Sequence, residues 1–316
     1  MFNDILIKEF KEFEVKYDKY TSSDVRLIDV VVKYLSKHKG KMLRPALVFQ
    51  IAKSLGGKVN DKTYVVACLV EMIHVATLIH DDIVDESELR RGWPTIGKIW
   101  KNKTSILVGD YLFSKALSSI IDLKDFKSIQ ILSAAATSLS RGEILQIEKS
   151  KSRYMDEDVY FKMIEDKTAS LFMAACELSA RTVTSDNQLI EKSRQFGKNF
   201  GIAYQIKDDI DDVVGSSDRL GKPTNLDIKK NMITLPYIYS LNDMDKKSRL
   251  LFINKLKSLS KKNKTKEIKK EIDKYDGLKK TKSVLRSYID KSNKFMDEIC
   301  RDSKNSFIMN RVFNDK

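Results

Sequence analysis

Three aspartates, Asp81, Asp82 and Asp85, form the group with the clearest chemical potential in the chain. They end an apolar run that reaches upstream to Tyr64, and its length favours a helix with a buried face over a strand. Positions i and i+4 share one face of a helix, so the three carboxylates are predicted to lie within about one turn of each other. Grouped carboxylates suit Mg²⁺, which completes its shell with water and phosphate oxygens.

The same pattern recurs downstream at Asp208, Asp209 and Asp212, with Asp211 as an additional acid. A single acidic cluster on a helix is most often a solvated surface. Two clusters at the ends of apolar helical runs are hard to explain in that way, because an unpaired buried carboxylate is costly. The repetition therefore favours a functional metal site over surface decoration.

Basic residues accompany the first cluster. Arg90 and Arg91 follow it, and guanidinium groups match the geometry of phosphate oxygens. Lys41 and Arg44 stand just before Pro45, which favours a helix start, so both cations are expected beside unpaired N–H groups and the positive end of a helix dipole. Carboxylates for a metal together with these cations predict a diphosphate-binding site.

These motifs resemble those of the trans-isoprenyl diphosphate synthases, also called polyprenyl synthetases. The resemblance extends from about Lys39 to Pro236 and includes Gly40-Lys41-Met42-Leu43-Arg44-Pro45, His74, DDIVD, RRGWPT, Lys167-Thr168, Gln205-Ile206-Lys207-DDIDD, Gly221-Lys222 and Thr234-Leu235-Pro236. It implies an all-α fold, a single-domain helical bundle of the isoprenoid-synthase type around a central cavity, spanning residues 1–316. The part after residue 236 is expected to form generic, Lys-rich C-terminal helices.

The resemblance also assigns roles to individual residues. It implies two to three Mg²⁺ ions held by Asp81, Asp82, Asp85, Asp208, Asp209 and Asp212. It places the diphosphate of isopentenyl diphosphate on Lys41, Arg44, His74 and Arg91. It places an allylic diphosphate on Arg90, Lys167, Thr168, Gln205 and Lys222, with Gln146 expected near the diphosphates.

Two points stay open within these assignments. Lys167 lies beside Glu165 and Asp166, so a surface ion pair of little energetic consequence is the alternative to a catalytic, diphosphate-binding role. Many family members carry a Gly-Lys pair where Asn231 and Met232 stand here, with Lys229 and Lys230 slightly upstream, which puts a phosphate contact from this position in doubt. His80 adjoins Asp81 and is interpreted as a packing or capping residue.

The implied reaction is carbon–carbon bond formation by ionisation. The allylic diphosphate departs, and the double bond of isopentenyl diphosphate attacks the resulting cation, which must meet the alkene before water does. The departing diphosphate is the expected base for the final proton. Product length should depend on Ala76 and Thr77, whose small side chains leave the path below the first cluster open, and on Met72, Leu69 or Val65 further down. We expect a product of about six to ten isoprene units, limited by the shape of the cavity, which would serve for quinone side chains.

Composition agrees with a helical, soluble enzyme. The 316 residues are 42% hydrophobic and contain only 12 Gly and 4 Pro, with no convincing alternating strands. Charges at Asp4, Lys8 and Glu9 interrupt any signal-peptide core, and no stretch of about 20 apolar residues is expected, so the protein is predicted to be cytoplasmic. Cys68, Cys176 and Cys300 are odd in number and widely spaced, which indicates buried thiols and neither disulfides nor zinc.

The formal net charge of +14 is concentrated in the segment 246–280, which has 14 Lys and Arg against 4 Asp and Glu. Leu251, Phe252, Leu256 and Leu259 recur there at helical spacing, which predicts amphipathic surface helices with a solvated basic face. A weak attraction to an anionic membrane surface is the alternative. Nucleic-acid binding is disfavoured because no aromatic and basic motif accompanies the charge.

Other functions share parts of this pattern. A short-chain farnesyl or geranylgeranyl diphosphate synthase differs only in product length. A class I terpene cyclase would not need the isopentenyl site of Lys41, Arg44 and Arg91. A metal phosphohydrolase is poorly supplied with ligands by the three histidines, His38, His74 and His80. A non-catalytic synthase subunit is disfavoured because both aspartate clusters are complete. Family resemblance further implies a homodimer.

Overall fold

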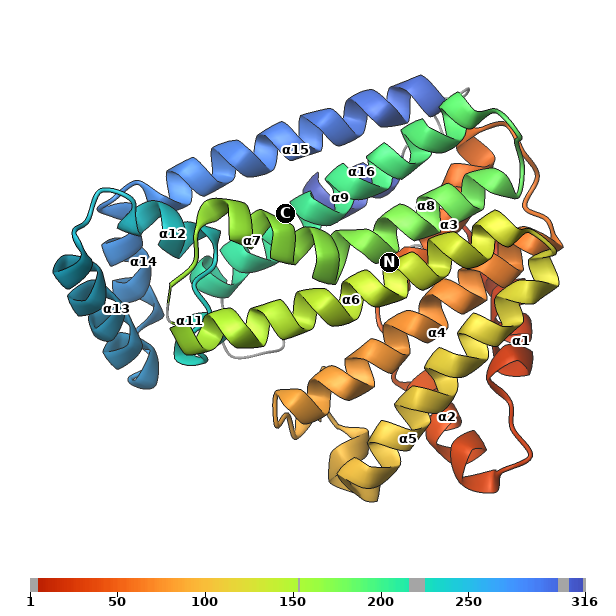
Figure 1. Ribbon diagram of the computed structural model, residues 1–316, viewed down its shortest axis with the longest axis horizontal. Helices are drawn as coiled ribbons and strands as arrows, with labels where there is room; N and C mark the ends of the chain where they lie inside the picture. Colours follow the sequence, from red (N-terminus) through yellow and green to blue (C-terminus); the bar gives the residue numbers. More distant parts are fainter. Residues whose placement is uncertain (1–4, 153, 216–224, 301–306, 315–316) are drawn as a thin grey trace. The chain divides into compact units, whose positions relative to one another are not determined.

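The computed structural model describes residues 5–152, 154–215, 225–300 and 307–314. These residues are almost entirely helical (Figure 1), which confirms the predicted all-α class. The α-helices are α1 (Ile7–Thr21), α2 (Arg26–Lys37), α3 (Leu43–Ser54), α4 (Asp61–Val84), α5 (Ile96–Ser119), α6 (Phe126–Ser152), α7 (Glu157–Ile164), α8 (Ser170–Arg181), α9 (Asn187–Val214), α11 (Leu226–Lys229), α12 (Leu235–Leu241), α13 (Lys246–Lys261), α14 (Thr265–Asp273), α15 (Gly277–Ile299) and α16 (Phe307–Met309). Shorter elements are the 3₁₀ turn η1 (Ile120–Leu123), the π-helical turns η2 (Glu165–Ala169) and η4 (Asn310–Asn314), and the strands β1 (Leu89–Arg90) and β2 (Trp93–Pro94).

Capping residues explain where the functional helices begin. Asn60 accepts a hydrogen bond from the Thr63 N–H at 3.1 Å, and the Thr63 hydroxyl accepts one from the Asn60 N–H, a capping box that starts α4. The Thr95 hydroxyl accepts a hydrogen bond from the Lys98 N–H at 3.3 Å, and this cap starts α5 at Ile96. The backbone of α5 is kinked at Lys101, where φ is 70°.

The chain forms two compact units, each made of several segments. The first unit comprises Met1–Ala136, Leu171–Gly197 and Asn293–Lys316, and the second comprises Thr137–Ser170 and Lys198–Ser292. Helices α6, α9 and α15 each supply residues to both units. A single domain over residues 1–316 stays a prediction.

Aromatic side chains pack at the centre of the first unit. The ring of Phe49, on α3, lies edge-on to Phe10 at 5.9 Å and to Phe13 at 6.2 Å between centroids, and it also contacts Tyr64 of α4. Phe49 has no solvent exposure. These contacts join α1 to α3 and α4, which carry Arg44 and His74, two of the residues predicted to bind isopentenyl diphosphate.

Helix α4 is more apolar than the sequence analysis expected. Its length and its mean hydropathy of 1.6 over 18 residues are sufficient to cross a membrane, so the expectation that no such stretch exists was wrong. However, 67% of that window is buried inside the protein, as in the core helix of a globular domain. The apolar surface of α4 is therefore used for internal packing.

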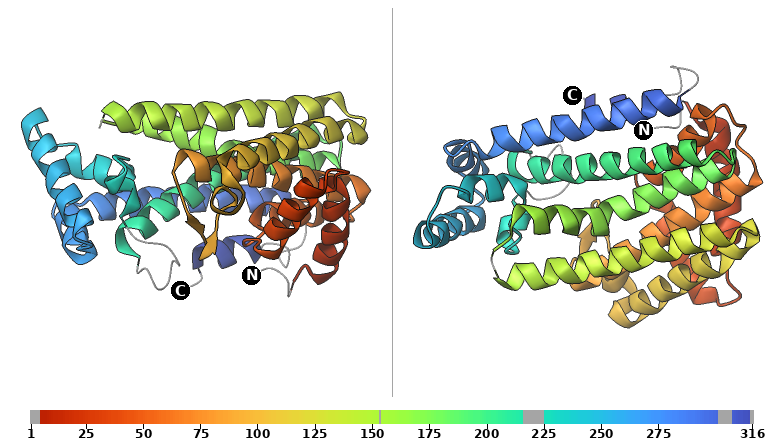
Figure 2. Two further views of the ribbon diagram at one scale, coloured as in Figure 1. Left: turned by 90° about the horizontal axis from the view of Figure 1, so that it is seen from below. Right: turned by 45° about the horizontal axis from the view of Figure 1, so that its top comes forward.

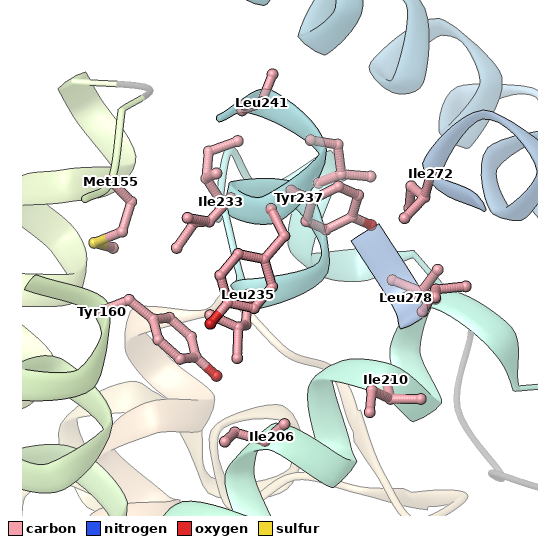
Figure 3. Close-up of a cluster of buried hydrophobic side chains, with 14 of the residues drawn as sticks. Met155, Tyr160, Ile206, Ile210, Ile233, Leu235, Tyr237, Leu241, Ile272 and Leu278 are labelled. Atoms are coloured by element: carbon pink, nitrogen blue, oxygen red, sulfur yellow. The ribbon is translucent and has the colours of Figure 1, made fainter. Parts of the chain in front are cut away.

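The second unit has its own apolar core (Figure 3). Tyr160 of α7 and Ile206 and Ile210 of α9 pack with Leu235 and Tyr237 of α12. In the close-up the Tyr160 hydroxyl points toward α9, the helix that carries the second aspartate cluster. This core fixes α7 and α9 against each other.

The Lys-rich segment forms the predicted amphipathic helices. Phe252, Ile253 and Leu256 are buried on one side of α13, while Leu251, which was expected on the apolar side, is 62% exposed. Cys68 and Cys176 are buried as predicted, and burial raises the pKa of the Cys68 thiol to about 12. Cys300 is only partly buried, so the expectation of a buried thiol was wrong there.

Replacing Phe49 with alanine should remove the ring that joins α1, α3 and α4. We expect the free energy of unfolding to fall by about 3–5 kcal/mol, the usual cost of a Phe-to-Ala cavity. Urea unfolding followed by circular dichroism measures the change. The matched control is Val15→Ala on α1, whose side chain is 68% exposed and should leave the midpoint almost unchanged. Equal midpoints for the two variants would contradict the packing described.

Candidate active site

The first aspartate cluster lies at the carboxyl end of α4. The helix ends at Val84 with Asp85 as its C-cap, and the Asp85 N–H donates to the Asp81 carbonyl at 2.8 Å. Asp85 is exposed and Asp81 is partly exposed. Carbonyl groups without helical partners give a helix end a partial negative charge, which adds to that of the carboxylates. This end of α4 therefore attracts cations strongly.

Arg90 supplies one of these cations. Its Nε donates to Asp82 Oδ1 at 2.8 Å, and the Asp82 side chain is only 12% exposed. Burial raises the pKa of Asp82, although Arg90 opposes that shift. The residue predicted to bind the allylic diphosphate thus pairs with a predicted metal ligand in this structure.

The Arg90-Arg91-Gly92-Trp93 segment forms a two-residue hairpin, drawn as short arrows in the left view of Figure 2. Arg91 has φ 53° and Gly92 has φ 81°, and two successive positive φ angles are characteristic of a type I′ turn. Arg91 reaches back over the backbone of Gly40, where any Cβ would collide with its guanidinium group. The hairpin therefore holds Arg91 against the Gly40-Lys41 segment, as the predicted isopentenyl site requires.

Arg91 is one of the residues that line a cavity of about 370 Å³ in the first unit. The side of α4 that carries Glu71, His74 and Leu78 lines this cavity. Burial and the cations of Arg44, Arg91 and Arg90 lower the pKa of His74 well below its usual range. The imidazole is therefore neutral near pH 7 and carries one N–H for donation to an anion.

Glu71 is a residue that sequence reasoning missed. It is buried one helical turn before His74, and burial raises its pKa to about 7 despite the opposing charges of Arg44 and Arg91. The sequence could have indicated Glu71, because it lies three residues before His74 and therefore on the same helix face. The Arg44 guanidinium stacks on the Phe172 ring at 4.5 Å, which fixes the predicted ligand from α3. Lys41 is exposed.

The residues predicted to control product length lie elsewhere on α4. Ala76 and Met72 are fully buried, and neither they nor Thr77 line the cavity of the first unit. The Thr77 hydroxyl donates to the His74 carbonyl at 2.8 Å, within its own helix. Their role in product length stays a prediction.

The second cluster lies near the carboxyl end of α9, and its members have different surroundings. Asp208 is exposed, whereas Asp209 and Asp212 are 2% and 4% exposed. Asp212 accepts hydrogen bonds from the N–H groups of Leu226 at 3.1 Å and Asp227 at 3.4 Å.

Asp209 and Asp211 in the same segment also have partners. Asp209 accepts from the Tyr160 hydroxyl at 2.5 Å and the Gln205 amide at 2.8 Å, and Asp211 pairs with Lys207 at 2.6 Å. Burial raises the pKa of Asp209 to about 7, against the effect of its two donors. Asp208 is thus the exposed carboxylate of this cluster.

Lys167 lies in the π-helical turn η2 between α7 and α8. Its Nζ donates to Gln146 Oε1 at 2.9 Å and forms an ion pair with Glu143, both on α6. Lys167 is therefore in an ion pair, but with an acid of α6, since Glu165 pairs with Lys198 at 2.9 Å and Asp166 with Arg141 at 2.7 Å. Isolated π turns often mark functional sites.

Gly142 allows η2 to approach α6. A Cβ at this position would lie 2.8 Å from Lys167 Cα, closer than real contacts allow. In the Ser140-Arg141-Gly142-Glu143 sequence, Gly142 thus allows η2 to approach α6, and Glu143 is the acid that pairs with the Lys167 ammonium. Thr168, next in the turn, donates to Gln205 Oε1 at 2.8 Å. Lys167, Thr168, Gln205 and Gln146 are brought together as predicted.

Two other predicted features have different outcomes. Lys222 lies outside the described residues. Asn231 has φ 65°, in the left-handed region that glycine favours and asparagine tolerates, so the turn expected for a glycine is kept. Met232 offers no cation, while Lys229 and Lys230 are exposed. His80 lies 3.3 Å from both Asp110 and the Ile106 carbonyl of α5, in agreement with a packing role.

The carboxylate oxygens present fit Mg²⁺, a hard cation that prefers oxygen ligands. Within the described ranges, no three Asp, Glu, His or Cys side chains are gathered closely enough to hold a metal ion unaided. Asp81, Asp85 and Asp208 are the accessible carboxylates, so water and substrate phosphate oxygens would have to complete the shell.

Known proteins share both the sequence and the fold. The polyprenyl synthetase family model matches residues 25–274. An all-trans-nonaprenyl-diphosphate synthase (geranyl-diphosphate specific) from Rhodobacter capsulatus is 34% identical over 77% of this chain and 74% of its own. Heptaprenyl diphosphate synthase component 2 from Bacillus subtilis is 32% identical over 88% and 79%, respectively.

A crystal structure of polyprenyl synthase from Caulobacter crescentus CB15, complexed with calcium and isoprenyl diphosphate, has a TM-score of 0.88 at 29% identity. The match covers 98% of this chain and 94% of that one, which confirms the predicted isoprenoid-synthase fold. The chain belongs to the polyprenyl synthetase family, and the prediction of a prenyltransferase is thereby confirmed.

Proposed function

We propose that this protein condenses isopentenyl diphosphate head-to-tail with an allylic diphosphate, in the presence of Mg²⁺, to make a long-chain trans-polyprenyl diphosphate. The observation that carries the proposal is the pair of carboxylate clusters, each at the carboxyl end of a long helix and each accompanied by cations. We infer that Asp81 and Asp85 at the end of α4, and Asp208 at the end of α9, are the carboxylates that bind metal in this reaction. Bound Mg²⁺ would neutralise the charge that develops on the departing diphosphate.

The isopentenyl diphosphate is assigned to the cavity of the first unit. Arg91 and neutral His74 line this cavity and offer a guanidinium group and one hydrogen bond to its phosphates, and Arg44 and Lys41, which do not line the cavity, are proposed as further cations. The apolar wall, which includes Val75, Leu78 and Ile79, excludes water from the alkene. The cavity lining thus contains both cationic and apolar side chains, which suit the diphosphate and the hydrocarbon part of this substrate.

The allylic diphosphate is assigned to Lys167 and its neighbours in the second unit, while the role of Arg90 in the first unit rests on the family resemblance. Lys167 is held by Glu143 and Gln146, and Thr168 is held by Gln205, so the cation is positioned before substrate binds. Such preorganisation lowers the cost of stabilising charge as the C–O bond breaks. Lys222 is proposed as a further cation for this diphosphate.

We propose a product of about six to ten isoprene units, because the side chains of Ala76 and Thr77 are too small to block a path below the first aspartate cluster. The relatives that make nonaprenyl and heptaprenyl diphosphates support this length. Ala76 and Thr77 are small, and in the family the equivalent positions restrict the product when they are bulky.

We also propose that the active form is a homodimer. Apolar side chains on α5 are exposed, including Ile99 at 44%, Ile106 at 44% and Leu107 at 58%, and Phe126 at the start of α6 is 73% exposed. An exposed apolar stripe of this kind favours association with a second chain. The Bacillus subtilis relative is named as one component of a synthase, so a different partner subunit is the alternative.

Asp208 and Asp211 provide a matched test of the metal site on one helix. Asp208→Asn should lower kcat by about 10²-fold or more, because it removes an exposed oxygen ligand from the charge-stabilising site. Asp211→Asn should change kcat by little, since Asp211 is already paired with Lys207. Radiolabelled isopentenyl diphosphate incorporation measures both. Unchanged turnover in Asp208→Asn would refute the proposed reaction site.

Ala76→Phe should shorten the main product, since a ring would block the path below the first cluster. The control is Val75→Phe. Because Val75 lines the cavity of the first unit, the added ring should raise KM for isopentenyl diphosphate and leave the product length unchanged. Thermal unfolding verifies that both fold, and chromatography of the dephosphorylated products gives their lengths. A wild-type product ending at fifteen or twenty carbons would contradict the long-chain proposal. An unshortened product from Ala76→Phe would contradict the role of Ala76.

Leu107→Glu should break the proposed homodimer, because it places a charge on the exposed stripe of α5. Light scattering after gel filtration should give twice the 36.4 kDa chain mass for the wild type and the mass of one chain for Leu107→Glu. Val15→Glu, at a 68% exposed site on α1, is the control and should stay dimeric. A monomeric wild type would exclude the homodimer and favour a second, different subunit.

A further inference from the structure

Asp209 accepts two buried hydrogen bonds from other side chains, and the proposed binding of metal does not require either of them. Oδ2 accepts from the Tyr160 hydroxyl at 2.5 Å, and Oδ1 accepts from the Gln205 amide at 2.8 Å. Tyr160 is 0% exposed and Asp209 is 2% exposed. Both oxygens of this carboxylate are therefore engaged by protein donors, away from solvent.

The hydrogen bonds continue from Asp209 toward Lys167. Gln205 Oε1 accepts from the Thr168 hydroxyl at 2.8 Å. Thr168 follows Lys167 in the π turn η2, and Lys167 is held from its other side by Gln146 and Glu143. An unbroken series of contacts thus joins α7, α9, η2 and α6 within the second unit.

The surroundings make this series rigid. Tyr160 lies in the apolar core of the second unit, between Met155 and Ile206 in the view of Figure 3. Its hydroxyl has Asp209 as the acceptor, and a buried carboxylate that loses a donor bears the full cost of desolvation. The close approach at Gly142 leaves η2 little room to move toward α6.

We propose that Asp209 and Tyr160 are positioning residues that fix Lys167 and Asp208 relative to each other, in place of the metal-ligand role that the sequence predicted for Asp209. Asp208 precedes Asp209 by one residue and faces solvent, so holding Asp209 fixes the direction of Asp208. Gln205 and Thr168 transmit the same constraint to Lys167. The expected effect on catalysis rests on the proposed function, whereas the series of hydrogen bonds does not depend on it.

Tyr160→Phe tests the proposal, because it removes one hydroxyl and leaves the Asp209 carboxylate intact. The matched control is Tyr239→Phe, since Tyr239 is 8% exposed, belongs to the same core and donates to Glu157 at 2.6 Å. Both variants lose one hydroxyl-to-carboxylate hydrogen bond. Only Tyr160 is joined to α9 and η2 through that bond.

We expect Tyr160→Phe to lower kcat by roughly ten- to a hundredfold, the effect of losing one hydrogen bond to a charged group. The Mg²⁺ concentration for half-maximal rate should stay within about twofold of the wild type, because no ligand is lost. Tyr239→Phe should keep kcat. A kcat equal to that of Tyr239→Phe, or a Mg²⁺ concentration for half-maximal rate raised well beyond twofold, would overturn the proposal.

A second readout does not depend on catalysis. Amide hydrogen exchange of the metal-free, substrate-free protein should be faster in residues 165–169 of Tyr160→Phe than in the wild type or Tyr239→Phe. Unchanged exchange there would overturn the positioning role even if the rate fell. If the wild-type chain showed no prenyl transfer, the proposed function would fail, and the exchange result would still decide whether Tyr160 holds η2.

Discussion

The strongest physical constraint in this structure is the concentration of negative charge at the carboxyl ends of α4 and α9. Each end combines the negative end of a helix dipole with three carboxylates spaced at i, i+1 and i+4. Two charges 4 Å apart repel by about 4 kcal/mol at an effective dielectric constant near 20. Such groups are stable only where each carboxylate faces water or has a donor, and the structure uses both solutions.

The carboxylates within each cluster therefore have different tasks. Arg90 compensates Asp82, and the N–H groups of the segment starting at Leu226 compensate Asp212. Asp85 and Asp208 stay exposed. An acidic motif that looks uniform in sequence thus separates into residues that organise the protein and residues that remain accessible to a metal-bound substrate.

Much of this was predictable because it depends on local rules. Apolar periodicity predicted the helices, and the types and spacing of Asp81, Asp208 and Lys167 predicted a diphosphate site. The partners of these residues were not predictable, since Tyr160 is 49 residues from Asp209 and no local pattern links them. The π turn at η2 and the raised pKa of Glu71 depend in the same way on tertiary packing and burial.

The paired state of the cations affects how substrate binds. Lys167 is paired with Glu143 and Arg90 with Asp82, so a diphosphate arriving at either cation exchanges one anionic partner for another. A partly buried cation without a partner would destabilise the fold, and the internal pairs avoid that cost. The net affinity for the diphosphate then depends on how much more strongly its extra charge and its bound metal interact with the site than the carboxylate that they replace. Because of this exchange, strong local charges are compatible with reversible binding of a diphosphate that must leave after each condensation.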